Sequence, residues 1–301
     1  MYDLIVIGGG PAGLTATIYA LRKRLNVLMI SRDLGGKTNY HLSLPWIEDY
    51  QVIRGLEVVN KFKSELEYLK FARQMDTVEH IERLPDGFEV QTKTGAKFTT
   101  RAVILATGTR QRRLSVPGEK EFIMRGLCYS ALSYAPLFID RKTVVIGDGD
   151  LALRSAAELA TVASHVHLVG PSRDALHSAL GQKLLQAKNV TVLEGYSASE
   201  VKGNGFANAI VVMSPEGKEV ELQADGTFVE LALVPNSQMV AHLLELDEQG
   251  RIKVDCYART SVPGIFAAGD VTNSYAEQVL VAVGDGAKAA LSAYDYLLPM
   301  L

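Results

Sequence analysis

Two glycine-rich segments of this 301-residue chain have the residue types and the spacing to bind phosphates. Residues 8–13 read GGGPAG, which fits G-x-G-x-x-G, and residues 147–152 read GDGDLA, which fits G-x-G-x-x-A. Between a strand and a helix, such glycines allow a tight turn and let the backbone approach a pyrophosphate, which the helix N-terminus attracts. The predicted first turn contains Gly8, Gly10, Pro11, Ala12 and Gly13. The predicted second turn contains Gly147, Asp148, Gly149, Asp150, Leu151 and Ala152.

Cysteine and histidine offer little further chemistry. The two cysteines, Cys128 and Cys256, lie too far apart in sequence for a Cys-x-x-Cys pair or a thiolate metal cluster. We interpret each as a buried free cysteine. A thiol role for Cys128 close to a cofactor and a bond between the two cysteines are the less favoured alternatives. His165 and His167 share one face of a predicted strand without a third ligand nearby, so we predict no metal site.

The elements around the two turns predict how the chain is organised. Short apolar runs typical of buried parallel strands precede both turns, and helical spacing follows each of them. The predicted strands lie at residues 4–7, 27–30, 103–108, 143–146, 166–169 and 263–270. We therefore predict an α/β protein with two Rossmann-like three-layer dinucleotide-binding domains, the second inserted in the first. The predicted limits are 1–116 and 244–301 for the first domain and 117–243 for the second.

Composition narrows the classes of partner. The net charge of −3 gives no electrostatic reason to expect nucleic acid or an acidic membrane surface. No apolar run reaches the roughly 18 residues that a membrane span needs. The N-terminal residues enter a strand directly, without a basic region or a cleavage site. These features predict a cytoplasmic protein with no membrane association.

Several further segments resemble those of one flavoprotein family. They are VILATG at 103–108, PGIFAAGDV at 263–271, GGK at 35–37, WIEDY at 46–50 and GDGAKAALSAYDYL at 284–297. In this order and at these distances they are similar to low-molecular-weight thioredoxin reductases and to the flavoprotein subunit of alkyl hydroperoxide reductase. The resemblance implies FAD binding, a homodimer, and domains that rotate so that nicotinamide and disulfide alternate at the flavin.

The resemblance also implies which residues hold FAD. Asp270 would bind a ribitol hydroxyl, and the helix start at Gln278 would face the flavin pyrimidine, where its dipole stabilises negative charge on the reduced ring. Glu277 stands where relatives carry a basic residue; the plain alternative is an acid in the first turn of a helix. Which of Tyr40, Trp46, Tyr129 or Tyr134 stacks on the flavin stays open. The FAD-site residues predicted beyond the first turn are Gly36, Lys37, Asp49, Ala106, Thr107, Gly108, Gly269, Asp270, Glu277, Gln278 and Val279.

Two segments depart from the family pattern. The family's disulfide segment aligns with GLCYSALSYA at 126–135, so Ser130 and Ser133 occupy the two thiol positions. A serine hydroxyl cannot form a reversible two-electron bridge, which argues against thioredoxin reduction. In the second predicted domain, the strand at 166–169 leads into Gly-Pro-Ser, and Arg173 is the only base nearby. Asp148 would also repel a pyrophosphate if it pointed inward. Both features argue against tight NAD(P)H binding.

Three functions stay open at this point. In the first, an FAD oxidoreductase is reduced by a donor other than free NADPH, either ferredoxin or a second FAD, as in the ferredoxin-linked and diflavin branches of the superfamily. In the second, NAD(P)H reduces the flavin weakly and a small molecule or a protein accepts the electrons. In the third, the chain binds flavin without catalysis. We favour the first.

Overall fold

The computed structural model describes residues 1–47 and 55–301, which form two compact units. The described part of the first unit comprises residues 1–39, 55–110 and 234–301, and that of the second comprises 40–47 and 111–233. The second unit is thus inserted in the first, and the predicted α/β class is confirmed. The predicted domain limits, after residues 116 and 243, lie C-terminal to the points where the two units divide.

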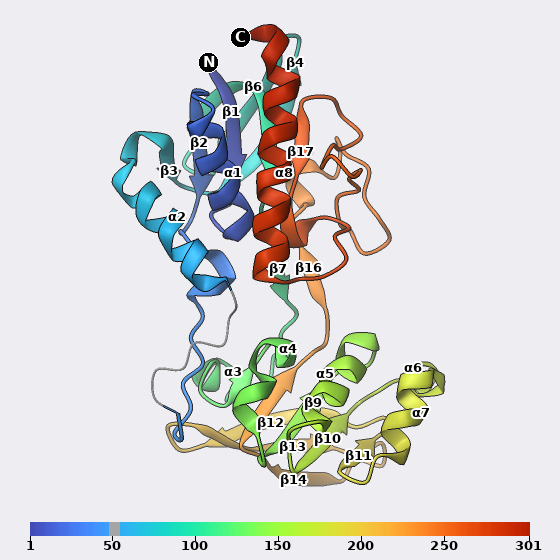
Figure 1. Cartoon of the computed structure of the whole chain (residues 1–301). Helices are drawn as coiled ribbons and strands as arrows, with labels where there is room; N and C mark the ends of the chain where they lie inside the picture. Colours follow the sequence, from blue (N-terminus) through green and yellow to red (C-terminus); the bar gives the residue numbers. More distant parts are fainter. Residues whose placement is uncertain (48–54) are drawn as a thin grey trace. The chain divides into compact units, whose positions relative to one another are not determined.

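The first unit is built on a largely parallel sheet (Figure 1). Strands run in the order β3-β2-β1-β6, and β17 pairs with the C-terminal half of β6, while the antiparallel hairpin β4–β5 pairs with its N-terminal half. The strands are β1 (Tyr2–Ile7), β2 (Val27–Ser31), β3 (Arg73–Met75), β4 (Val78–Leu84), β5 (Gly87–Thr92), β6 (Lys97–Leu105) and β17 (Ile265–Ala267). The segments that follow β1, β6 and β17 therefore all lie at the same carboxyl edge.

Both faces of this sheet are buried, which explains the continuous apolar runs. On β1, Leu4 and Val6 pack under the helices, whereas Ile5 and Ile7 pack against the hairpin β4–β5 and the segment that follows residue 238. Small residues let the helix that begins at Pro11 and the helix that begins at Val279 approach closely. A Cβ added to Gly286 of the second helix would lie 2.1 Å from the carbonyl oxygen of Ala12 in the first. The helices are α1 (Pro11–Arg22), α2 (Leu56–Tyr68) and α8 (Val279–Leu297), with 3-10 turns η1 (Gly36–Asn39), η2 (Lys70–Ala72), η4 (Gln238–Val240), η5 (Gly269–Val271) and η6 (Leu298–Met300).

The second unit repeats the plan with a smaller parallel sheet, in the order β11-β10-β9-β15-β8. Helices cover one face, and a three-stranded antiparallel sheet covers the other. The parallel strands are β8 (Leu127–Cys128), β9 (Lys142–Ile146), β10 (His165–Val169), β11 (Val190–Leu193) and β15 (Gly226–Val229). The antiparallel strands are β12 (Ser197–Gly203), β13 (Ala207–Met213) and β14 (Glu219–Gln223). The helices are α3 (Glu119–Phe122), α4 (Ala131–Tyr134), α5 (Asp150–Ala160), α6 (Arg173–His177) and α7 (Ala179–Gln186), with one 3-10 turn, η3 (Ala135–Phe138).

The chain passes between the units along two paired strands, β7 (Thr109–Gln111) and β16 (Leu233–Pro235). Within the described residues, no helix is both long enough and apolar enough to cross a membrane. The same residues contain no group of three or more His, Cys, Asp or Glu side chains that could hold a metal ion.

Candidate functional site

The first glycine turn, between β1 and α1, has the geometry that a dinucleotide phosphate needs. Gly8 adopts a φ of 117°, and a Cβ there would lie 2.1 Å from the carbonyl oxygen of Ala106. Gly13 lies against Gly8, because a Cβ added to Gly13 would lie 1.8 Å from the carbonyl oxygen of Gly8. At Gly10, which caps α1, no described atom lies within 4 Å of such a Cβ. The turn is therefore tight on its protein side and open at Gly10, where a pyrophosphate would approach.

The other segments predicted to bind FAD meet this turn at the carboxyl edge of the sheet. A Cβ on Gly36 would lie 3.1 Å from the Cα of Gly10, and a Cβ on Gly269 would lie 3.0 Å from the Cβ of Ala12. Helix α8 begins at this edge as well, with Gln278 as its N-cap. The edge thus brings together two helix N-termini and the residues that follow β6 and β17, an arrangement suited to an anionic ligand. Asp49 lies outside the described residues.

Hydrogen bonds between Thr107 and Asn236 connect the segment after β6 to the segment after β16. This contact was not predicted from the sequence. The hydroxyl of Thr107 donates to the carbonyl oxygen of Asn236 at 2.7 Å, and the Asn236 amide donates to the carbonyl oxygen of Thr107 at 2.9 Å. Ala106 is buried beside them, and Gly108 accepts the backbone N–H of Asn236. In the sequence, Asn236 belongs to ELALVPNSQ at 230–238, which resembles a segment that the family has where the chain returns to the FAD-binding domain.

Charged side chains gather at the same edge. The ammonium of Lys37 lies 2.5 Å from a carboxylate oxygen of Asp270 and 2.9 Å from the hydroxyl of Thr109, so the predicted ribitol-binding acid is ion-paired. Glu277 precedes the N-cap of α8, which corrects the alternative that placed it in the helix's first turn. The pKa of Glu277 is raised, mainly by partial desolvation and also by the negative charge of Asp270. The positive charges of Lys37 and Arg251 reduce this increase.

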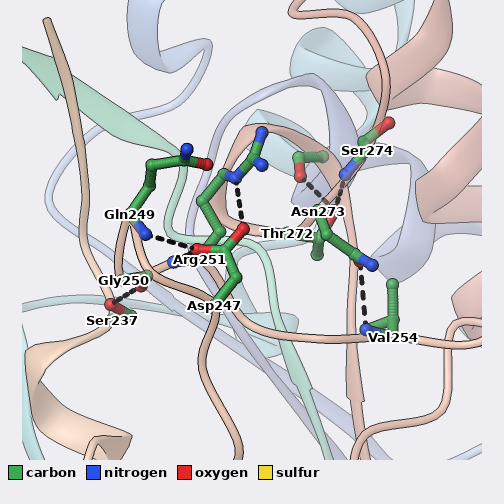
Figure 2. Close-up of polar contacts among 10 residues, drawn as sticks. Ser237, Asp247, Gln249, Gly250, Arg251, Val254, Thr272, Asn273 and Ser274 are labelled. Carbon is green, nitrogen blue, oxygen red and sulfur yellow. Dashed lines mark hydrogen bonds and ion pairs between the residues drawn. The ribbon is translucent and has the colours of Figure 1, made fainter.

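Arg251 is itself paired and belongs to an ordered loop (Figure 2). Its Nε donates to Asp247 at 2.7 Å, and its backbone N–H donates to the same carboxylate at 2.8 Å. Partial burial favours the protonated form of Asp247, but these hydrogen bonds outweigh it and lower the pKa of that carboxyl. The side chain of Asn273 accepts the backbone N–H of Val254, and Thr272 accepts that of Ser274, so the loop after β17 is also held in place.

In the second unit, the two serines at the aligned thiol positions bond to each other. The Ser130 hydroxyl donates to the Ser133 hydroxyl at 3.0 Å across the start of α4. The residue before Ser130 is also fixed, because the Tyr129 hydroxyl donates to Glu119, whose carboxylate accepts the backbone N–H groups of Leu114 and Ser115 at 2.8 Å each. These hydrogen bonds add to the burial of Leu127, Cys128 and Tyr134 in holding the segment in place.

The two cysteines differ in exposure. Cys128 lies on β8 with 0% of its surface exposed, and burial, with the negative charge of Glu230, raises the pKa of its thiol far above the ordinary value. A group in this state is neutral and inert, which supports its interpretation as a structural cysteine. Cys256 is free as well but exposed, so the interpretation of Cys256 as buried was wrong. Cys256 lies in a turn and lines a cavity at the surface of the first unit.

The four aromatic residues considered for stacking all have contacts in the second unit. Trp46 donates to the carbonyl oxygen of Leu137 at 3.2 Å, and the guanidinium of Arg141 lies 4.4 Å from its ring centre. Tyr134 donates to the carbonyl oxygen of Tyr40 at 3.3 Å, and Tyr129 is held by Glu119.

The second glycine turn, between β9 and α5, keeps the shape of the first but carries different charges. A Cβ on Gly147 would lie 2.3 Å from the carbonyl oxygen of Glu230, and Gly149 faces open space among the described atoms. Asp148 and Asp150 flank Gly149 and are exposed. Leu151 is half-buried and Ala152 is buried against Gly147. The turn can therefore admit a pyrophosphate sterically, while two carboxylates stand beside it.

The polar side chains that follow β10, and Ser155 on α5, bond to other groups of the protein. Arg173 donates to Glu194 at 3.0 Å, and both side chains are exposed. Ser172 caps α6 by accepting the backbone N–H of Ala175. The buried Ser155 donates to Glu230 at 2.9 Å, at the carboxyl end of β15. Each of these groups has a partner within the protein.

Comparison with known proteins agrees with this architecture. The family model described as "Pyridine nucleotide-disulphide oxidoreductase" matches residues 2–286. A Bacillus subtilis NADH dehydrogenase is 35% identical over 99% of this chain and 59% of its own length. The F subunit of the Pseudomonas aeruginosa alkyl hydroperoxide reductase is 36% identical over 99% of this chain and 58% of its own length. The chain thus spans about three-fifths of the curated relatives that it matches.

Among solved structures, a thioredoxin reductase from Streptococcus pyogenes superimposes with a TM-score of 0.87 at 33% identity, over 99% of both chains. Thioredoxin reductase from Giardia duodenalis superimposes with a TM-score of 0.86 at 29% identity, again over 99% of both chains. These matches confirm the predicted resemblance over the whole length of the fold. The chain therefore belongs to the pyridine nucleotide-disulphide oxidoreductase family and has a thioredoxin reductase-like fold.

Proposed function

We propose that this protein is an FAD-dependent oxidoreductase that transfers electrons without a dithiol relay and accepts them from a donor other than free NADPH. The observation that carries the proposal is the 3.0 Å hydrogen bond between Ser130 and Ser133, at the positions that align with the family's disulfide. Two hydroxyls cannot exchange electrons with a flavin or with a partner's disulfide. Cys128, buried and neutral, does not replace them.

The carboxyl edge of the first unit supports FAD as the cofactor. The open position at Gly10 and the N-termini of α1 and α8 fit a pyrophosphate, and Asp270 fits a ribitol hydroxyl. Bound FAD would supply a redox centre that exchanges one or two electrons. The protein's own part is to bind and orient it: Gly8 and Gly13 shape the turn, while Lys37 holds the carboxylate of Asp270 in place.

The second unit supports a donor other than free NADPH. A 2′-phosphate needs cationic partners, and Arg173, the base nearest the end of β10, is already paired with Glu194. Asp148 and Asp150 add negative charge beside the turn. We propose that reduced ferredoxin supplies the electrons instead, either directly or through a second FAD bound in this unit.

NADH is a second candidate donor, and one finding favours it. Two relatives that cover 99% of this chain, at 35% and 34% identity, are named NADH dehydrogenase. Because NADH lacks the 2′-phosphate, the pairing of Arg173 weighs less against it than against NADPH.

An anaerobic titration of the purified protein distinguishes these donors. The flavin absorbance is followed while NADH, NADPH, reduced ferredoxin and dithionite are each added. We expect reduced ferredoxin and dithionite to bleach the flavin at stoichiometric amounts and NADPH to leave it oxidised. Rapid bleaching by NADPH would contradict the proposal, and rapid bleaching by NADH would establish the second candidate. A flavin that only dithionite reduces would indicate a flavin-binding protein without this activity.

We also propose that the protein is a homodimer. Helix α8 and the C-terminal turn expose large apolar side chains, with exposed fractions of 52% for Leu280, 42% for Leu291 and 49% for Leu298. A second copy of the chain would cover such a surface. Light scattering during gel filtration should give twice the chain mass of 32.7 kDa; a mass that stays at one chain at micromolar concentration would contradict this.

A further inference from the structure

Lys37 is the central charge at the carboxyl edge of the first unit. Its ammonium lies 2.5 Å from Asp270 and 2.9 Å from the hydroxyl of Thr109, with the two ion-paired side chains 34% and 14% exposed. Lys37 therefore has little freedom to leave this edge, and its positive charge is fixed with respect to the elements around it.

This position lies between the two ends of the predicted cofactor site. The preceding residue, Gly36, lies next to Gly10 of the first glycine turn: a Cβ added to Gly36 would lie 3.1 Å from the Cα of Gly10. On its other side, Lys37 reaches Asp270, the predicted ribitol-binding residue.

Glu277 supplies the opposite charge near this position. It comes directly before Gln278, the N-cap of α8, at the carboxyl edge of the sheet. The carboxyl of Glu277 is within electrostatic range of Lys37, Asp270 and Arg251. Arg251 is paired with Asp247 at 2.7 Å. Lys37 is paired with Asp270 at 2.5 Å, so removing the ammonium would leave the Asp270 carboxylate uncompensated at this edge.

Resting on the FAD site proposed above, we propose that Lys37 and Glu277 set the reduction potential of the bound flavin in opposite directions. Reduction adds negative charge to the flavin. A fixed ammonium stabilises the reduced form and raises the potential, whereas a carboxylate destabilises it and lowers the potential. Because Lys37 is held by Asp270 and Thr109, it acts without reorganising when the charge appears.

The test measures the midpoint potential of bound FAD by anaerobic spectroscopic titration with a reference dye. Four variants are compared with the wild type: Lys37→Met, Lys37→Arg, Glu277→Gln and the double variant Lys37→Met/Glu277→Gln. The ion pair Lys97–Glu89, 2.6 Å apart on the hairpin side of β6, supplies matched controls as Lys97→Met and Glu89→Gln. Bound FAD per chain and the thermal midpoint are recorded for each protein.

We expect Lys37→Met to lower the potential and Glu277→Gln to raise it, each by about a tenfold change in the preference for reduced over oxidised cofactor. For a two-electron couple this is about 30 mV. Lys37→Arg and both control variants should stay near the wild type, and the double variant should return towards it. Because Glu277 is exposed, its variant tests the proposal even if Lys37→Met does not fold.

The failures of the two proposals are distinguishable. If the wild type takes up no FAD, the proposed function is wrong. If every variant holds FAD but the potentials of Glu277→Gln and Lys37→Met equal that of the wild type, or shift in the same direction, the inference is wrong and the FAD site stands.

Discussion

The hydroxyl of Ser130 donates a hydrogen bond to the hydroxyl of Ser133, with 3.0 Å between the two oxygens. Ser130 directly precedes α4 and Ser133 is the third residue of this helix, which is the spacing of a Cys-x-x-Cys pair. The two side chains are therefore close enough for a bond between them if both were thiols.

Restoring both thiols should restore a disulfide. In Ser130→Cys/Ser133→Cys, the side chains start within contact distance, so a bond needs only small side-chain rotations. We expect the oxidised double variant to lose two of its four thiols (two native plus two introduced) in titration under denaturing conditions, and dithiothreitol to restore them. Each single variant serves as a control and should keep all of its thiols. Four free thiols in the oxidised double variant would show that the geometry of the pair has changed.

The native cysteines should differ in reactivity. Cys256 is exposed, whereas Cys128 is buried with a raised thiol pKa, so an aromatic disulfide reagent at about pH 8 should modify Cys256 rapidly and Cys128 only after denaturation. Cys128→Ser should also leave flavin turnover within a few-fold of the wild type. A large loss of turnover in Cys128→Ser, with Cys256→Ser unchanged, would assign Cys128 a part in the chemistry.

Flavin binding should depend on the open position at Gly10. A leucine there would fill the space that faces no other described atom, so Gly10→Leu should fold but lose its yellow colour. Gly284→Leu is the matched control, because Gly284 also faces open space among the described atoms and lies on the exposed side of α8. The measurement is FAD released on heating, separated from FMN by chromatography. Full FAD retention by Gly10→Leu would place the pyrophosphate elsewhere.

Acid should destabilise the second unit through His167. Desolvation, with the charges of His165 and Lys142, lowers the pKa of His167 below its ordinary 6.5, and its Nδ1 has no hydrogen-bond partner among the described atoms. The unfolded chain therefore binds a proton before the folded chain does, so the free energy of unfolding falls as pH drops below 6.5, by at most about 1.4 kcal/mol per pH unit.

Urea unfolding between about pH 5 and pH 7.5 measures this slope. In His167→Gln it should be shallower than in the wild type, whereas His177→Gln, which changes an exposed histidine at the end of α6, should leave it unchanged. Equal slopes in all three proteins would show that other groups dominate the response to acid.

The sequence predicts the parts of this fold that depend on short-range pattern. Short apolar runs identified six parallel strands (β1, β2, β6, β9, β10 and β17) and both glycine turns, because burial on two faces and a tight turn restrict residue type locally. The antiparallel strands β4, β5 and β12–β14 were not predicted. The charge pair of Lys37 with Asp270 could not be read in this way, since it joins residues that are distant in sequence and meet only when β17 pairs with β6. The exposure of Cys256 was missed for a related reason: cysteine is usually buried, and the irregular loop that carries this one has no periodicity.

The two glycine turns have the same shape and different charges, which should limit FAD binding to the first turn. Gly10 and Gly149 both face open space among the described atoms, but Asp148 and Asp150 stand only beside Gly149. At about 5 Å, one carboxylate opposes each pyrophosphate charge by roughly 3 kcal/mol at an effective dielectric near 20, less where water screens it. We therefore expect one FAD per chain after incubation with excess FAD. Gly149→Leu should keep that FAD, and Gly10→Leu should lose it. A ratio that approaches two in the wild type and falls to one in Gly149→Leu would instead establish a second FAD in the inserted unit.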